Sequence, residues 1–482
     1  MSDVVRFGSK VRALRRREGM SQADLAAKLG ISASYLNLIE NHKRPLPAPL
    51  LVKLAQQFNV DLGQFASDED ARLVSDLMEA FADPMFDDPA LTQAEVRDMA
   101  AASPAASRAV ITLYRAYRAA KGAADDLSSR IAERDDLGQG AAPAHLPSEE
   151  VSDFIQRNQN HFAALETGAE ELVAKGKLHT DEIYQGLVRF LEKELGISVQ
   201  IARSEKARET LRRFDPQKKT LMLSELLPTR SRSFQLAYQI GMLTQTKTID
   251  ALVQREGYLT TDASRALARV ALGNYFAGAM LMPYEAFLRA AREERYDIDV
   301  LGRRFRVGFE QTCHRLTTLR RPGAEGISFH MVRIDVAGNI SKRFSASGIR
   351  IARFSGACPR WNIFAAFSTP GMVRIQLSRM PDGSAYFCLA RTVKADSHGF
   401  HAQPRTHAIG LGCPVTHARE LVYSDGLDLD NADGYVPVGV TCRLCERTDC
   451  EQRAFPSLRH PLKINENVRG ASLYAAVSTS RG

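Results

Sequence analysis

The sequence predicts a multidomain α+β protein with four parts: an all-α helix-turn-helix head, a helical linker, an α/β middle domain and a mixed, β-rich C-terminal domain that contains cysteines. Three observations support this. The chain has 482 residues, more than one hydrophobic core usually serves. Helical spacing of apolar residues runs through the first part of the chain, and strand-like alternation returns towards its end. All seven cysteines lie at or after Cys313. We therefore expect domains at residues 1–66, 67–149, 150–320 and 321–482.

The composition is that of an ordinary soluble globular protein, with 44% hydrophobic and 25% charged residues. No apolar run reaches the roughly 18 residues that a membrane-spanning helix needs. The first residues also lack the basic-then-apolar pattern of a secretory signal. We expect a cytoplasmic protein with no membrane partner.

The charge is unevenly distributed along the chain. Residues 1–66 carry 10 Lys or Arg against 5 Asp or Glu, residues 67–150 carry 8 against 17, and residues 303–360 carry 12 against 3. A basic head suits the phosphate backbone of double-stranded DNA. The second basic region either binds another anion or forms a solvated face.

Local helix signals define the head. Ser21 and Asp24 form a capping-box-like pair at the start of one helix, Gly30 ends it, and Ser32 caps the next. Two short helices joined by a tight turn make a helix-turn-helix, whose second helix reads operator DNA. An outward Asn on that helix can pair with adenine through two hydrogen bonds. The expected DNA-contacting residues are Gln22, Ser32, Ser34, Tyr35, Asn37, Lys43 and Arg44. The stretch SQADLAAKLGISASYLNLIENHKRP resembles the Xre family of lambda-repressor-like regulators.

Two helical segments make up the linker, residues 68–100 and about 104–137. In the second, apolar residues recur at three- and four-residue steps, as in a coiled coil. These positions are Val110, Leu113, Tyr117, Ala120, Ala124, Leu127 and Ile131. The helix either packs on its own chain or joins two chains in a homodimer or higher oligomer.

In the middle domain, SFQLAYQIGML followed by GNYFAGAMLMP resembles the ImmA/IrrE metallopeptidase fold. That family carries His-Glu-x-x-His on the first of these helices and an acidic zinc ligand on the second. The matching positions here are Tyr238, Gln239, Met242 and Leu272. These side chains do not make a zinc site with a general base. We therefore expect no enzyme activity, which disfavours the alternative of a zinc-dependent peptidase that cleaves a partner regulator.

A pocket that has lost its metal can hold a ligand instead, although polar side chains there can also be satisfied core groups. An arginine-rich stretch follows, with six Arg between residues 303 and 321. Arg binds phosphate through paired hydrogen bonds, but a solvated face is the other interpretation. The candidate ligand-binding residues are Tyr238, Gln239, Asn274, Tyr275, Arg303, Arg304, Arg315 and Arg320.

The sequence CRLCERTDCEQRAFP is the sharpest feature of the C-terminal domain. Its cysteines, Cys442, Cys445 and Cys450, follow a C-x2-C-x4-C spacing, and Cys413 is the natural fourth thiol. His417 or Cys358 are alternative ligands. Such closely spaced thiolates suit an iron–sulfur cluster, with structural zinc as the main alternative.

The order of these parts resembles the short-chain fatty-acyl transcriptional regulators over nearly the whole chain. The most specific strings are the cysteine-rich tail, ACPRWNIFAAF and HRLTTLRRPG. The resemblance implies control of propionate, acetate, methylcitrate-cycle or glyoxylate-cycle genes. It also implies a short acyl-CoA as the effector and a [4Fe-4S] cluster in the tail.

Overall fold

The structure is a computed structural model. It describes residues 8–41, 44, 46–58, 68–83, 85–86, 91–133, 147–203, 210–352, 357–394, 405–443 and 445–457. The chain divides into two compact units, one built mainly from residues 1–145 and the other mainly from residues 146–456. No helix among the described residues is long and apolar enough to cross a membrane.

Four helices form the head, which we define as residues 8–58: α1 (Gly8–Arg17), α2 (Gln22–Leu29), α3 (Ala33–Glu40) and α4 (Ala48–Phe58). Their apolar faces meet in one small core. Its members are Val11, Leu25, Ala26, Leu29, Leu36, Ile39, Leu50 and Leu54. The caps expected from the sequence are present, because Ser21 and Asp24 form a capping box and Gly30 adopts φ 72°. The predicted all-α head is therefore confirmed.

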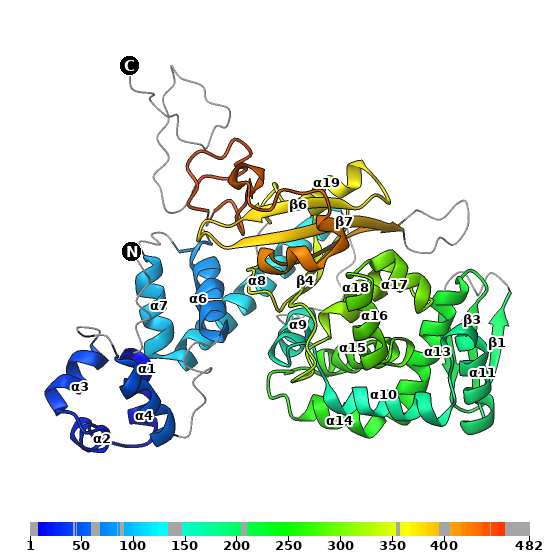
Figure 1. The fold of residues 1–482 in the computed structure, drawn as a ribbon, viewed down its shortest axis with the longest axis horizontal. Helices are drawn as coiled ribbons and strands as arrows, with labels where there is room; N and C mark the ends of the chain where they lie inside the picture. The colour runs from blue at the N-terminus through cyan, green and yellow to red at the C-terminus, as the bar shows by residue number, and fades with distance from the viewer. Residues whose placement is uncertain are drawn as a thin grey trace. The chain divides into compact units, whose positions relative to one another are not determined.

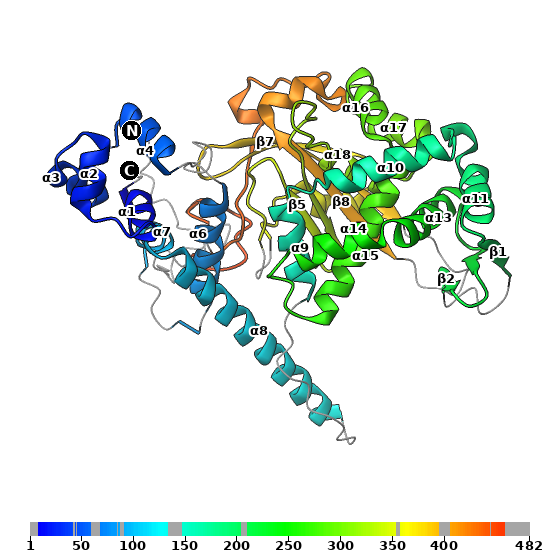
Figure 2. The same cartoon turned by 90° about the horizontal axis from the view of Figure 1, so that it is seen from below.

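Three further helices complete the first unit: α6 (Asp68–Phe81), α7 (Gln93–Ala102) and α8 (Pro104–Glu133). The segment expected as one helix over 68–100 is thus two helices. Helix α8 is long and extends beyond α6 and α7 (Figure 2). It packs on its own chain through Ile111 and Tyr114, and the Tyr114 hydroxyl donates to Asp83 Oδ2 at 2.9 Å.

The coiled-coil-like seam lies on another face of α8. Leu113 is 70% exposed, whereas Val110 and Tyr117 are half-buried. The side chains of Ala124, Leu127 and Ile131 lie outside the described residues. The described half of the seam is therefore only partly covered by its own chain.

The second unit begins with a helical layer around α15 (Figure 1). Its helices are α9 (Pro147–Arg157), α10 (Ala163–Lys175), η1 (Thr180–Glu182), α11 (Ile183–Glu194), α13 (Thr229–Thr244), α14 (Thr246–Gln254), α15 (Asp262–Leu281), α16 (Tyr284–Glu293), α17 (Ile298–Arg304) and α18 (Phe309–Thr317). Helix α15 touches α9, α10, α13, α14 and α18. A small sheet of order β1-β3-β2 lies beside α11 and comprises β1 (Ser198–Ala202), β2 (Arg212–Asp215) and β3 (Thr220–Ser224).

A six-stranded sheet of order β5-β4-β8-β7-β6-β9 follows. Its strands are β4 (His330–Ile334), β5 (Ile340–Ser345), β6 (Arg374–Arg379), β7 (Ala385–Lys394), β8 (Thr406–Pro414) and β9 (Val436–Pro437). All neighbours are antiparallel except β6 and β9. The remaining short helices are α19 (Asn362–Ala365), η2 (Ala366–Ser368), η3 (Val415–Glu420), η4 (Val422–Ser424) and η5 (Ala432–Gly434). The β4–β5 and β6–β7 connections are hairpins, with Gly338 and Gly383 at positive φ in their turns.

The helical layer and the large sheet share one hydrophobic core. Phe276 and Phe287 of the helices belong to the same buried cluster as Phe387, Ile409 and Leu411 of the sheet. The expected boundary near residue 320 therefore does not separate two cores. This continuity matters because a large cavity is lined by both layers.

Candidate functional sites: the head, the cavity and the cysteine loop

The recognition helix α3 presents a short polar surface. Ser34 and Asn37 are exposed, whereas Tyr35 is half-buried against the head core. Ser32 is the N-cap, and its Oγ accepts a hydrogen bond from Tyr35 N at 3.1 Å. Because its hydroxyl is already used in the cap, Ser32 is a weaker candidate for base contact than Ser34 or Asn37.

The other expected DNA contacts surround α3. Gln22 Nε2 donates to Glu40 Oε2 at 2.8 Å and lies 3.4 Å from Asn37 Oδ1, so this side chain links α2 to α3. Arg44 is exposed just after α3. Lys43 lies outside the described residues.

Sequence reasoning missed Glu40, whose side chain is buried at the end of α3. Its carboxylate accepts hydrogen bonds from Arg15 Nε at 2.7 Å and Arg15 Nη2 at 3.0 Å, as well as from Gln22. Burial alone would raise the pKa of Glu40, but the hydrogen bonds from Arg15 and Gln22 outweigh it and lower the pKa. A buried carboxylate is tolerated only when it is paired in this way. Glu40 therefore fixes the orientation of the recognition helix against α1 and α2.

In the second unit, the residues that match the peptidase zinc motif on α13 are closely packed. A Cβ on Gly273 of α15 would lie 2.8 Å from both Met242 Sδ and Tyr238 Cε2 of α13. The Arg212 guanidinium stacks on the Tyr238 ring at 4.0 Å, and its Nη1 donates to Gln239 Oε1 at 3.0 Å. Tyr238 and Gln239 are therefore packed core groups.

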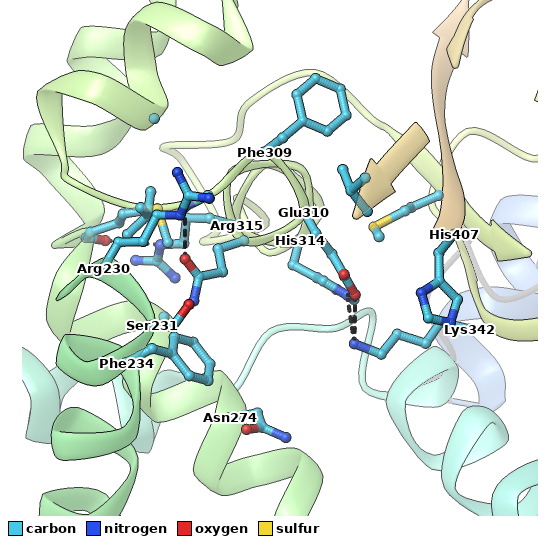
Figure 3. A pocket seen from close by; sticks show the side chains of 18 of the residues that line it. Arg230, Ser231, Phe234, Asn274, Phe309, Glu310, His314, Arg315, Lys342 and His407 are labelled. Carbon is cyan, nitrogen blue, oxygen red and sulfur yellow. Dashed lines mark hydrogen bonds and ion pairs between the residues drawn. The ribbon is translucent and has the colours of Figure 1, made fainter. Parts of the chain in front are cut away.

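A cavity of 1630 Å³ lies elsewhere in this unit. Helix α15 lines it through one stripe, comprising Leu267, Val270, Ala271, Asn274, Tyr275 and Gly278. These positions follow the helical pattern i, i+3, i+4, i+7, i+8, i+11. Because they face this open space, Leu267 and Val270 are more than 40% exposed. Figure 3 shows Arg230, Ser231 and Phe234 on one side of the cavity, and Lys342 and His407 on the other. Of this stripe, only Asn274 and Tyr275 were expected from the sequence as ligand-binding residues.

The cavity wall is rich in positive charge. Eight Lys or Arg residues line it against four Asp or Glu residues. Each of the four acids pairs with a lining cation, in the contacts Glu149–Arg343, Asp181–Arg306, Asp299–Arg391 and Glu310–Lys342. The excess of cations favours an anionic occupant.

Four of the eight expected ligand-binding residues line this cavity: Asn274, Tyr275, Arg303 and Arg315. The other four do not, and the expectation is corrected for each. Tyr238 and Gln239 pack with Arg212, as described above. Arg304 is on the surface and pairs with Glu293 and Glu294, since consecutive residues of a helix point about 100° apart and Arg304 therefore leaves α17 in another direction than Arg303. Arg320 Nη1 donates to Ser328 Oγ at 2.6 Å.

Arg315 reaches the cavity only with its edge, because it is 2% exposed and bound to Glu166. Two hydrogen bonds join the guanidinium to the carboxylate, at 2.6 Å and 2.9 Å. The Tyr275 hydroxyl also donates to Glu166 Oε1, at 2.5 Å. Burial raises the pKa of Tyr275 well above its usual value, so the phenol stays protonated and remains a donor. Arg315 and Glu166 thus form a buried structural pair behind the cavity.

A second charged group lies between the two layers. Glu310 Oε1 on α18 accepts from Arg333 Nη1 at 2.9 Å and from Lys342 Nζ at 3.0 Å, and it lies 3.6 Å from His314 Nε2. Although burial opposes it, these neighbours lower the pKa of Glu310 strongly. Burial and the adjacent Lys342 also lower the pKa of His314, which favours the neutral imidazole. The carboxylate therefore ties α18 to β4 and β5.

The cysteine loop, which we define as residues 442–450, is held by Arg453. This guanidinium is 6% exposed and donates to Cys442 O at 2.7 Å and Cys445 O at 2.9 Å. The Ala454 amide donates to Cys442 Sγ at 3.4 Å. Hydrogen bonds from backbone amides to cysteine sulfur are a feature of iron–sulfur sites.

Cys358 lies near this loop, because Cys442 and Cys445 act on its thiol. Its backbone N–H donates to Val440 O at 3.0 Å, and a Cβ on the adjacent Gly439 would lie 3.0 Å from Cys445 Sγ. Burial first, and then the thiols of Cys442 and Cys445, raise the pKa of Cys358. Among the described residues, no three Cys, His, Asp or Glu side chains are gathered as a metal site.

Cys413 does not join them, which corrects the expected fourth ligand. It is fully buried on β8 opposite Phe387, and it belongs to the main core of the unit. His417 is also directed elsewhere, since its Nδ1 lies 2.7 Å from Glu420 Oε1. Cys358 is thus the better fourth partner for Cys442, Cys445 and Cys450.

Comparison with known proteins defines the class. Three family profiles match in chain order: Helix-turn-helix at residues 11–65, IrrE N-terminal-like domain at 192–317, and Short-chain fatty acyl coenzyme A regulator, C-terminal, at 318–474. A head of this type followed by an IrrE-like domain and a regulator C-terminal domain defines a DNA-binding transcription regulator.

The particular family follows from full-length relatives. The chain is 39% identical over 475 residues to the HTH-type transcriptional regulator PrpR of Mycobacterium tuberculosis, covering 98% of this chain and 96% of that one. It is 40% identical over 469 residues to RamB of the same species, covering 97% and 98%. It is also 40% identical over 480 residues to the Propionyl-CoA carboxylase regulator of Cereibacter sphaeroides, covering 99% and 100%. A solved Mycobacterium tuberculosis transcriptional regulator superposes with a TM-score of 0.66 at 42% identity, covering 69% of this chain and all of that one. The chain belongs to the short-chain fatty acyl-CoA regulator family.

Proposed function

We propose that this transcription regulator binds a short-chain acyl-CoA in its central cavity, and that binding changes how a dimer of heads reads its operator. The genes concerned would serve propionate or acetate metabolism, in keeping with the name of the Cereibacter relative. The observation that supports this proposal most strongly is the cavity itself, with its large volume and its excess of lining cations.

The chemistry of the cavity suits CoA. Ligand pockets for drug-sized molecules measure about 300–1,000 Å³, and 1630 Å³ leaves room for a longer ligand. Arg230 and Arg303 provide donors for phosphate groups. Phe234, Val270 and Phe309 provide apolar surface for the pantetheine arm and a short acyl chain.

Titration of acetyl-CoA, propionyl-CoA and free CoA tests the effector, followed by calorimetry and by the thermal midpoint. Arg303→Ala should weaken binding by about 10-fold or more, since a hydrogen bond to a charged group contributes about 1.5–3 kcal/mol. Arg304→Ala is the matched control, because Arg304 is adjacent to Arg303 in the sequence but pairs with surface acids outside the cavity. Absence of binding by all three compounds would refute the effector proposal.

Operator reading is assigned to the exposed face of α3. Asn37→Ala should reduce affinity for a DNA sequence selected from a random library by about 1–3 kcal/mol, the value of one good bidentate base contact. Gln57→Ala on the exposed side of α4 is the control. Equal loss in both variants would show that α3 does not read bases.

Dimerisation is assigned to the seam on α8. Leu113→Glu places a charge on the most exposed apolar position of the described seam, whereas Thr112→Glu places the same charge beside it on an exposed polar position. Light scattering should find monomers for Leu113→Glu and dimers for Thr112→Glu. A wild-type monomer would reject the dimer.

A metal centre is assigned to Cys358, Cys442, Cys445 and Cys450. Four thiolates would hold an iron–sulfur cluster, which can report redox state, or a structural zinc. Iron, acid-labile sulfide and zinc are to be measured after anaerobic purification. Cys358→Ser should lose the metal, and Cys413→Ser should retain it. Retention in Cys358→Ser with loss in Cys413→Ser would instead make Cys413 the fourth ligand.

A zinc peptidase is the second candidate, favoured only by the IrrE-like match. Tyr238, Gln239 and Met242 supply no imidazole or carboxylate for zinc. Peptide cleavage with added zinc that is abolished by Gln239→Ala would revive it.

A further inference from the structure

We propose that the Glu149 carboxylate is an internal anion seated on the cationic wall of the cavity, and that an anionic group of the effector displaces it from Arg343. Displacement would release helix α9 from strand β5. This inference rests on the proposed role of the cavity as the effector site.

The position of α9 in the chain makes it a candidate transmitter. It is the first described element after α8, so it is the helix through which the second unit is joined to the DNA-binding unit. Several of its residues line the cavity, among them Ser148, Glu149, Ser152 and Ile155. An occupant of the cavity therefore contacts the helix that leads to the linker.

Two polar contacts fasten α9 to β5. Arg343 forms an ion pair with Glu149, and both side chains are largely buried, at 12% and 19% exposure. The Gln156 side-chain amide binds Ser345 on both sides, accepting from its N–H at 3.0 Å and donating to its carbonyl at 2.9 Å. Glu149 and Gln156 are two helical turns apart, and Arg343 and Ser345 are two residues apart, so each pair shares one face. The Gln156 amide thus bonds to the backbone of the edge strand β5 as a neighbouring strand would. The Glu149–Arg343 ion pair holds the start of α9 against the same strand.

Charge makes the Glu149 contact exchangeable. On the same wall, Lys342, Arg343, Lys394 and His407 face the cavity. A phosphate carries more charge than a carboxylate and can accept two hydrogen bonds from Arg. The effector and Glu149 then compete for Arg343. If the effector binds more tightly to the state in which the Glu149–Arg343 pair is broken, its binding raises the population of that state and releases α9 from β5.

Two acidic side chains provide matched controls. Glu150 lies beside Glu149 in the first turn of α9, but its carboxylate accepts from Thr260 N at 2.9 Å and Thr260 Oγ1 at 2.6 Å. Asp181 also lines the cavity, but it lies outside α9 and pairs with Arg306. Glu150→Gln therefore controls for loss of charge from the helix, and Asp181→Asn controls for loss of charge from the cavity.

The test is calorimetric titration of full-length protein with CoA. Glu149→Gln should bind CoA about 5- to 20-fold more tightly, within the usual range for coupling between linked sites. Glu150→Gln should bind like the wild type, and Asp181→Asn should gain clearly less than Glu149→Gln. Equal gains in Glu149→Gln and Asp181→Asn would show that loss of any negative charge from the cavity wall strengthens CoA binding. That result would refute a specific competition between the effector and Glu149 for Arg343.

Hydrogen exchange provides the structural readout. CoA should accelerate amide exchange in residues 147–157 of the wild type, and Glu149→Gln should show this faster exchange without CoA. Unchanged or slower exchange would reject release of α9. If the wild type binds CoA and Glu149→Gln binds it no more tightly, only this inference fails. If no CoA compound binds to the wild type, the proposed effector fails with it.

Discussion

The buried pair of Glu166 and Arg315 gives the sharpest prediction for stability. Glu166→Gln preserves the shape of the side chain but leaves the Arg315 guanidinium, which is 2% exposed, without its counter-charge. Arg cannot escape by losing its proton, because its pKa lies far above neutrality. Removing one partner of a buried ion pair costs about 3–5 kcal/mol. In a unit of this size the thermal midpoint should fall by about 6–20 °C, at roughly 2–4 °C per kcal/mol.

The assay is intrinsic fluorescence during heating, because the single tryptophan, Trp361, lies in the second unit and reports on it alone. The double variant Glu166→Leu/Arg315→Met removes both charges and should unfold close to the wild type, since apolar replacement of a buried pair is often neutral or stabilising. A Glu166→Gln midpoint within about 2 °C of the wild type would refute a buried structural pair. It would instead favour the expectation from the sequence that Arg315 faces a ligand.

Three further predictions concern other buried contacts. Burial lowers the pKa of His330 to about 3, so the native imidazole stays neutral while the unfolded one protonates near pH 6.5. Because of this difference, the free energy of unfolding should fall by about 1.4 kcal/mol between pH 7.5 and 5.5. Unfolding followed by Trp361 fluorescence should show a weaker pH dependence in His330→Gln, and an unchanged pH dependence would contradict a buried neutral His330. Gly273→Ala should cost about 1–3 kcal/mol by overpacking, because the new Cβ would meet Met242 Sδ at 2.8 Å; a midpoint equal to the wild type would count against a filled zinc position. Glu40→Gln should destabilise the head by about 1–3 kcal/mol and weaken operator binding in anisotropy titrations, whereas intact affinity would show that Glu40 does not orient α3.

Local chemistry made the head predictable. Capping and chain reversal depend on residues three or four apart, so Ser21, Asp24 and Gly30 were enough to place both helices. Glu40 escaped prediction because its partners are distant in sequence: Arg15 is twenty-five residues away and belongs to another helix. In the sequence, a residue that will carry a buried charge is marked only by its position on an otherwise apolar helix face.

Long-range packing explains the errors in the second unit. The peptidase-like pattern drew attention to Tyr238, but the absence of a side chain at Gly273 lets α13 and α15 approach until that space is filled. Spacing alone could not choose between Cys358 and Cys413 as partners of the cysteine loop. The structure distinguishes their surroundings, because Cys413 lies opposite Phe387 inside the core, whereas the backbone of Cys358 hydrogen-bonds to Val440 near the loop.

Helix α15 has two different neighbourhoods within the IrrE-like fold. Its face at Gly273 packs against Tyr238 and Met242 of α13, whereas its stripe from Leu267 to Gly278 lines the cavity. The helices and the sheet around this cavity share one apolar core, so a ligand cannot move them apart cheaply. Helix α9 also belongs to this core, through Val151 and Phe154, but its described polar contacts with β5 are an ion pair and a side-chain amide. Among the described elements that line the cavity, α9 is therefore the one that we expect to move when a ligand binds.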